Sequence, residues 1–367
     1  MVYGPHTPET RAQMLASLGL DSVDQLFDDI PAPVRADGLE LPAPLSELDL
    51  SRELSALAAA NRTDLVSFLG AGVYRHYIPS AVDAVLSRGE FYTAYTPYQP
   101  EISQGTLQTI YEFQSLVGQL TGLPVVSASH YDGAAATAEA ALMTVRAKRR
   151  DRVLISRALH RHYIETARTY FAPGARELEE LPTTSDGLTD LEALEQALAD
   201  PDRPVAGLIL GQPNAFGLLE PMAQAAELAH AAGALFVAVV EPTSLAVLAP
   251  PADYGADIAA GEGQPLGIAP QYGGPYLGLL ACTKELMRQI PGRLVGRTTD
   301  VEGRRAFVMT LRAREQDIRR DKAASNICTN QALCALAATT YLATLGPHGP
   351  VSYTHLRAHE TNNSISY

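Results

Sequence analysis

Residues 205–240 read VAGLILGQPNAFGLLEPMAQAAELAHAAGALFVAVV. The two near-continuous apolar runs, 205–210 and 234–240, are typical of strands that are buried on both faces of a parallel sheet. The helical pattern at 222–232 predicts a right-handed crossover between them. This β-α-β unit therefore predicts a doubly wound α/β domain, with three α/β/α layers and a mostly parallel sheet.

The same alternation of strands and helices extends toward the N-terminus. The pattern predicts strands at 125–127 and 153–156, and helices at 105–121, at 160–170, from residue 190 onward and in an alanine-rich stretch that ends at 148. Gly122 and Pro124 end the first helix, and Asp190 occupies a capping position. Ligands of such folds bind at the carboxyl ends of the strands, so we expect the functional site there.

Three segments are predicted along the chain. Residues 1–65 form an N-terminal arm of short helices and a proline-rich extended segment. This arm could pack on a partner subunit or cover its own domain. Residues 66–349 form the large domain. Residues 350–367 contain an Asn/Ser cluster without an apolar period, and we interpret them as a non-native tail that contributes nothing to the fold.

Composition excludes several classes of function. The net charge of −13, without a sustained basic run, argues against nucleic acid or anionic membrane as a partner. No apolar run reaches the length of a membrane span. The three cysteines have no metal-ligand spacing, which predicts no metal site and a reducing, cytoplasmic location.

Seven segments carry a resemblance to a known family. They are FLGAGVY (68–74), YTPYQPEISQG (95–105), YDGA (131–134), GGPY (273–276), PGR (291–293), REQDIRR (314–320) and SNICTNQ (325–331). These segments resemble the alpha subunit (subunit 1) of two-subunit glycine dehydrogenase (decarboxylating), the P-protein of the glycine cleavage system. The resemblance implies the large domain of fold-type-I pyridoxal phosphate (PLP)-dependent transferases.

The resemblance also implies partners and a cofactor. It implies an α2β2 heterotetramer in which a homologous beta subunit, and not this chain, carries PLP covalently. It implies glycine as substrate and transfer of its aminomethyl group to the lipoyl H-protein. The family's small C-terminal domain would follow residue 347, and we expect it to be missing here. The alternative function is a non-catalytic scaffold or regulatory pseudoenzyme of the same fold.

The positions of the lysines agree with a cofactor that is held by the partner subunit. PLP chemistry requires a lysine amine on a short loop after a core strand. The sequence there is Gly261-Glu262-Gly263-Gln264-Pro265, and the Gln264 amide cannot form an imine. The chain has three lysines, Lys148, Lys284 and Lys322, and none is at this place. Arginine-rich usage thins out surface lysines but should not remove an essential one, so we predict that the covalent chemistry is lost or delegated.

The other candidates form a vestigial cofactor site. Small residues in a strand-to-helix turn could cradle a phosphate or merely allow a tight turn; they are Gly133, Ala134, Ala135 and Thr137. His130 could stack on a cofactor ring, or act as a base in an enzyme that works without lysine, but a hydrogen-bonded packing role is favoured. Glu241 ends a strand where this fold puts an acid against the pyridinium nitrogen. An exposed strand-end carboxylate is the favoured interpretation.

A second group of candidates would act on the neighbouring subunit. Two prolines fix the loop at 95–101, which holds Tyr95, Tyr98 and Glu101. This loop either contributes these side chains to a partner's site or forms a surface turn at an interface. We predict no catalytic residue in the chain alone. The four arginines at 312–320 are predicted to form a salt-bridged helix or a subunit interface rather than a substrate site.

Overall fold

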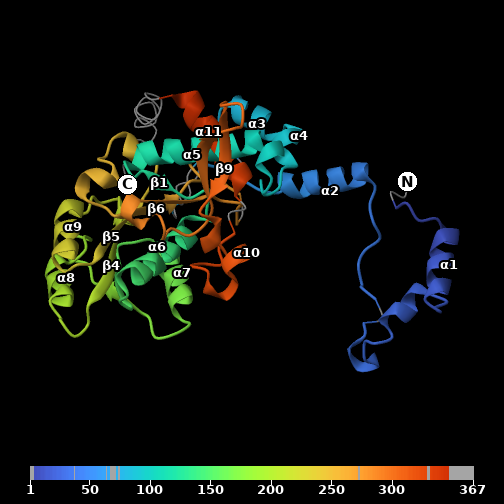
Figure 1. Cartoon of the computed structure of the whole chain (residues 1–367), viewed down its shortest axis with the longest axis horizontal. Helices are drawn as coiled ribbons and strands as arrows, with labels where there is room; N and C mark the ends of the chain where they lie inside the picture. The colour runs from blue at the N-terminus through green and yellow to red at the C-terminus, as the bar shows by residue number, and fades with distance from the viewer. Residues whose placement is uncertain are drawn as a thin grey trace. The chain divides into compact units, whose positions relative to one another are not determined.

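The computed structural model describes residues 4–36, 38–62, 64–66, 72, 75–271, 273–328 and 331–346. The chain divides into two units, Met1–Ser67 and Phe68–Tyr367. Figure 1 colours the first unit blue, and the second from cyan to red. The predicted tail at 350–367 and most of the segment at 68–74 lie outside the described residues.

The first unit consists of capped helices without a core. Its helices are α1 (Pro8–Ser17) and α2 (Glu47–Ala59). The hydroxyls of Thr7 and Ser46 each accept a backbone N–H from the first turn at 3.2 Å, which satisfies a donor that the helix leaves free. Neither helix buries a residue. The leucines of α2 are exposed.

A seven-stranded sheet organises the second unit. Its strands are β1 (Val125–Val126), β2 (Arg152–Ser156), β3 (Glu177–Leu181), β4 (Val205–Gln212), β5 (Leu235–Val240), β6 (Ile258–Glu262) and β7 (Gly278–Cys282). Their order is β1-β7-β6-β5-β4-β2-β3. The pairs from β3 to β6 are parallel, whereas β7 pairs antiparallel with both of its neighbours, β1 and β6. The predicted mostly parallel sheet is confirmed.

Helices cover both faces of this sheet. The helices α6 (Gly133–Lys148) and α7 (Arg161–Phe171) pack on one face, where they meet residues such as Val237 and Val239. The other face is covered by α5 (Gln104–Thr121), α8 (Leu191–Leu198), α9 (Met222–Ala231) and α11 (Ala332–Leu345). In Figure 1, α6 and α7 lie across the sheet from α5 and α11. The three predicted layers are therefore present.

A hairpin that the sequence analysis did not predict packs against α5. Its strands are β8 (Leu294–Thr299) and β9 (Arg305–Thr310), and they are antiparallel. Gln114 exchanges two 3.0 Å hydrogen bonds with the backbone of Val295, and Gln104 makes a similar pair at 2.9 Å with Phe307. These amide side chains hold the hairpin in register with the helix. The remaining short helices are α3 (Ser80–Leu86), α4 (Gly89–Tyr92) and α10 (Gln316–Arg319).

The arginine-rich segment is not one helix. It forms a 3₁₀ turn at Arg312–Arg314, then α10, then a second turn at Arg320–Lys322. Leu311 and Arg320 have φ angles of 53° and 54°, outside the helical range, so a continuous helix is impossible. The predicted ion pairs do form: Arg312 contacts Asp317 at 2.7 Å. The segment is thus salt-bridged, but the helix predicted there is wrong in extent.

Candidate functional site

The candidate site lies where the carboxyl ends of β5 and β6 meet the N-terminus of α6. A hydrogen bond between Gly133 and Glu262 joins these elements, and the phenol of Tyr163, from α7, lies beside Gly133. Fold-level reasoning places ligands at this edge of a parallel sheet. The sequence-predicted residues of the vestigial group flank this junction.

The N-terminus of α6 already holds two carboxylates. The Asp132 carboxylate caps the helix and accepts the backbone N–H of Ala135 at 2.6 Å. The Glu262 carboxylate accepts the N–H of Gly133 at 2.8 Å. Gly133, Ala135 and Thr137 are all buried. The turn thus has the geometry of an anion site, but its own side chains use the donors that a phosphate would need.

The Glu262 carboxylate accepts three backbone hydrogen bonds. In addition to Gly133, its carboxylate accepts the backbone N–H groups of Gln264 at 2.9 Å and Leu277 at 3.0 Å. Burial raises the pKa of Glu262 to about 7, although the three backbone donors act in the opposite direction. Sequence reasoning did not select this residue. Its one signal was an acid between two glycines at the end of a core strand.

Gln264 is built into its loop. The residue is 3% exposed, and its side-chain amide donates a hydrogen bond to the carbonyl of Ile268. No lysine replaces it at this place: Lys148 lies at the opposite end of α6, and the other two lie in the 3₁₀ turns at 284–286 and 320–322. The residue at the lysine position is therefore structural in this chain.

Glu241 and Tyr163 complete the cluster. Glu241 directly follows β5, and its Oε2 accepts the hydroxyl of Thr243 at 2.6 Å and the N–H of Ser244 at 2.7 Å. Its Oε1 is shielded from solvent and makes no hydrogen bond to the described residues. The favoured interpretation as an exposed carboxylate was wrong, because the loop that follows β5 folds over it. Burial raises the pKa of Glu241, and burial followed by the nearby carboxylates raises that of the Tyr163 phenol.

His130 is fully buried. Its backbone bridges Gly278 with hydrogen bonds of 3.0 and 2.9 Å, but neither ring nitrogen has a hydrogen-bond partner among the described residues. Burial lowers the pKa of the imidazole to about 3. The ring therefore has no free face for a cofactor and no access to a substrate as a base. The His130 ring packs in the core, as predicted, but its nitrogens lack the predicted hydrogen bond among the described residues.

The second candidate group lies at the surface. Tyr98 is 42% exposed, and the guanidinium groups of Arg293 and Arg312 lie 5.6 and 5.1 Å from its ring centroid. Such cation–π contacts restrict the ring without burying it. Tyr95 is 80% exposed, and Glu101 lies exposed in the 3₁₀ turn Pro100–Ile102. Among the described residues, the Tyr98 phenol accepts a hydrogen bond from Arg293 and not from the α6 N-terminus.

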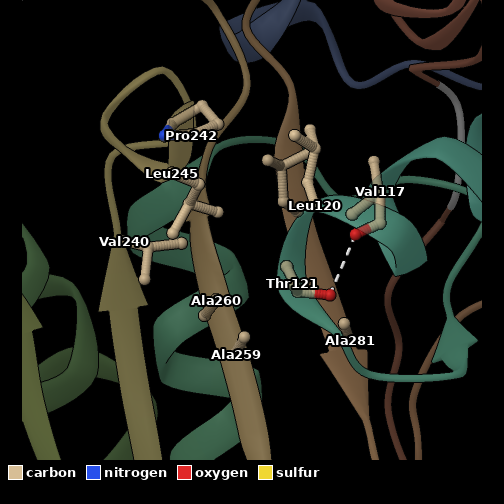
Figure 2. Close-up of a pocket in the computed structure, with 10 residues that line it drawn as sticks. Val117, Leu120, Thr121, Val240, Pro242, Leu245, Ala259, Ala260 and Ala281 are labelled. Atoms are coloured by element: carbon tan, nitrogen blue, oxygen red, sulfur yellow. Dashed lines mark hydrogen bonds between the residues drawn. The ribbon is translucent and has the colours of Figure 1, made fainter. Parts of the chain in front are cut away.

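A small pocket lies between α5 and the sheet (Figure 2). Val117, Leu120 and Thr121 of α5 face side chains from β5, β6 and β7, and nearly all the lining is apolar. The hydroxyl of Thr121 donates to the carbonyl of Val117 at 2.9 Å, so it is not available to a ligand. An apolar pocket without donors does not suit a phosphate or a carboxylate.

No helix among the described residues is long and apolar enough to cross a membrane. The described part of the chain contains no group of three or more His, Cys, Asp or Glu side chains placed to hold a metal ion.

The sheet, its covering helices and the site at the α6 N-terminus define the large domain of the fold-type-I PLP-dependent class. A bacterial sphingosine-1-phosphate lyase (Burkholderia pseudomallei) shares this fold, with 14% identity and a TM-score of 0.58 over 88% of this chain and 74% of that one. The residues present do not fit the cofactor of that class, because Gln264 replaces the lysine and Glu262 fills the anion site.

The family model of the glycine cleavage system P-protein matches residues 1–366, and the chain belongs to that family. A relative from Moorella thermoacetica, described as probable glycine dehydrogenase (decarboxylating) subunit 1, is 55% identical over 100% of this chain and 82% of its own. An inhibitor-bound crystal structure of glycine decarboxylase (P-protein) is similar with a TM-score of 0.87 and 46% identity, over 96% of this chain and 79% of that one.

The buried His130 predicts a pH dependence of stability. Its pKa falls from 6.5 in the unfolded chain to about 3 in the folded one, so its contribution is fully present above pH 6.5 and is lost as the pH falls. Between pH 7 and pH 5 the wild type should lose about 2 kcal/mol of unfolding free energy relative to His130→Leu. Urea unfolding at both pH values measures this. Parallel pH profiles for the two proteins would contradict it.

Proposed function

We propose that this chain is subunit 1 of a two-subunit glycine dehydrogenase (decarboxylating) and that it works only with a partner subunit. The observation that carries this proposal is the closed site: in a domain with the fold of a PLP enzyme, the Gln264 amide is hydrogen-bonded within its own loop, and the Glu262 carboxylate accepts the N–H of Gly133. The whole-chain identity of 55% to a relative described as such a subunit supports the same conclusion.

The partner would supply the covalent chemistry. Removal of CO2 from glycine leaves an electron pair on carbon, which requires an electron sink, and PLP on a homologous beta subunit would provide one. We propose an α2β2 assembly and the lipoyl arm of the H-protein as acceptor of the aminomethyl group. The net charge of −13 and the absence of a membrane-spanning helix among the described residues fit an enzyme with small or soluble protein partners.

This chain would contribute the loop at 95–101 to the partner's site. Two arginines contact the Tyr98 ring, and Pro97 is buried, so the loop loses little conformational entropy when it meets a neighbouring subunit. Arg293 also donates a hydrogen bond of 3.4 Å to the phenol oxygen. The loop thus presents a restrained phenol and, at Glu101, an exposed carboxylate.

Reconstitution tests the proposed function. The chain mixed with a beta subunit and lipoyl H-protein should catalyse exchange of labelled bicarbonate with the glycine carboxyl group, whereas either subunit alone should show less than about one hundredth of that rate. The physical reason is that each subunit alone lacks part of the cavity or the electron sink. Full activity of the beta subunit without this chain would instead support the scaffold or regulatory alternative.

Substitutions in the loop test its contribution in the assembled enzyme. Tyr98→Phe or Glu101→Gln should lower glycine turnover at least ~tenfold, which is about 1.4 kcal/mol of transition-state stabilisation. Sedimentation should show unchanged assembly. Tyr92→Phe is the matched control. It alters an exposed tyrosine that lies outside the loop, in α4, and should leave turnover unchanged. Normal turnover of both loop variants would reduce the loop to an interface.

A further inference from the structure

The Glu262 carboxylate lies in a site built for an anion. It accepts backbone N–H groups from three separate segments: the first turn of α6, the loop after β6 and the approach to β7. Backbone donors at a helix N-terminus are the usual means by which proteins hold a phosphate. Here the negative charge is covalently part of the chain.

The surrounding backbone leaves no room for a second anion. A Cβ on Gly133 would lie 2.3 Å from the phenol oxygen of Tyr163, and one on Gly261 would lie 2.3 Å from the carbonyl oxygen of Val240. A Cβ on Gly263 would meet the carbonyl oxygen of Leu277 at 2.9 Å. Glycines on both sides of Glu262 therefore bring three pieces of backbone together around one carboxylate.

We propose that Glu262 is a built-in anion that replaces an external phosphate at the N-terminus of α6 and keeps this domain closed without a cofactor. This inference deepens the proposed function, since a subunit that delegates its cofactor must hold the empty site together by other means. Deletion of the carboxylate should leave three buried N–H donors without a partner, which is costly, and should create a latent anion site.

The test is chemical rescue of Glu262→Ala by added anions. At pH 8 the melting temperature of the full-length variant should be several degrees below that of the wild type in about 100 mM chloride. Replacement of chloride by formate or inorganic phosphate at equal ionic strength should restore at least about 2 °C, in a saturable manner, since a ligand of the native state stabilises it. The wild type should not respond to this exchange.

Leu194→Ala is the matched control. Leu194 is fully buried in α8, in a different part of the core, so its truncation destabilises the domain without exposing helix N–H donors. This control should respond to formate and phosphate no more than the wild type does. A response of Glu262→Ala that equals that of Leu194→Ala overturns the proposal, and so does a melting temperature of Glu262→Ala equal to that of the wild type.

A second variant keeps the proposal testable if Glu262→Ala does not fold in chloride. Glu262→Gln keeps the side-chain volume but offers one acceptor oxygen in place of two, so its melting temperature at pH 8 should be lower than that of the wild type. An unchanged melting temperature overturns the proposal. All of these melting temperatures are measured on this chain without a partner. A negative result therefore contradicts the proposed role of Glu262, whereas a failed reconstitution contradicts the proposed function.

Discussion

The candidate site depends on one carboxylate and the three backbone donors that it satisfies. Glu262 joins the end of β6, the start of α6 and the segment that enters β7, which come from distant parts of the sequence. Buried N–H groups without partners are costly, so this interaction determines whether the edge of the sheet is open or closed. At this edge Gln264 and His130 are buried, and the loop that follows β5 binds the Glu241 carboxylate. This closed arrangement is the basis of our proposal that the chain works with a partner subunit.

Much of the fold could be predicted because its signals are local. The apolar runs at 205–210 and 234–240 and the stop signal at Gly122 each reflect neighbours in sequence, and the corresponding elements lie within a residue or two of their predicted bounds. The helix α11 was not predicted because it is apolar on all sides and lacks an amphipathic period. The β8–β9 hairpin was not predicted because amide side chains of α5 specify its register, and such contacts are not visible in a local pattern.

The candidate site also combines features with a local signal in the sequence and features that depend on long-range contacts. The missing lysine at Gln264 and the tight turn at Gly133 could be inferred from residue type and spacing. Glu262 and Tyr163 could not, because their roles arise from contacts such as the Gly133–Glu262 hydrogen bond, which spans 129 residues. The surroundings of Glu241 and His130 could not be inferred from residue type either, because the loop that follows β5 binds the Glu241 carboxylate, and the His130 ring is buried in the core.

The central claim is that this chain leaves the cofactor to its partner. Its most direct test is borohydride reduction of the assembled enzyme in the presence of PLP, followed by peptide mapping of both subunits. The account predicts a label on a lysine of the partner and none on Lys148, Lys284 or Lys322 of this chain. Stoichiometric labelling of any one of these three lysines would contradict it.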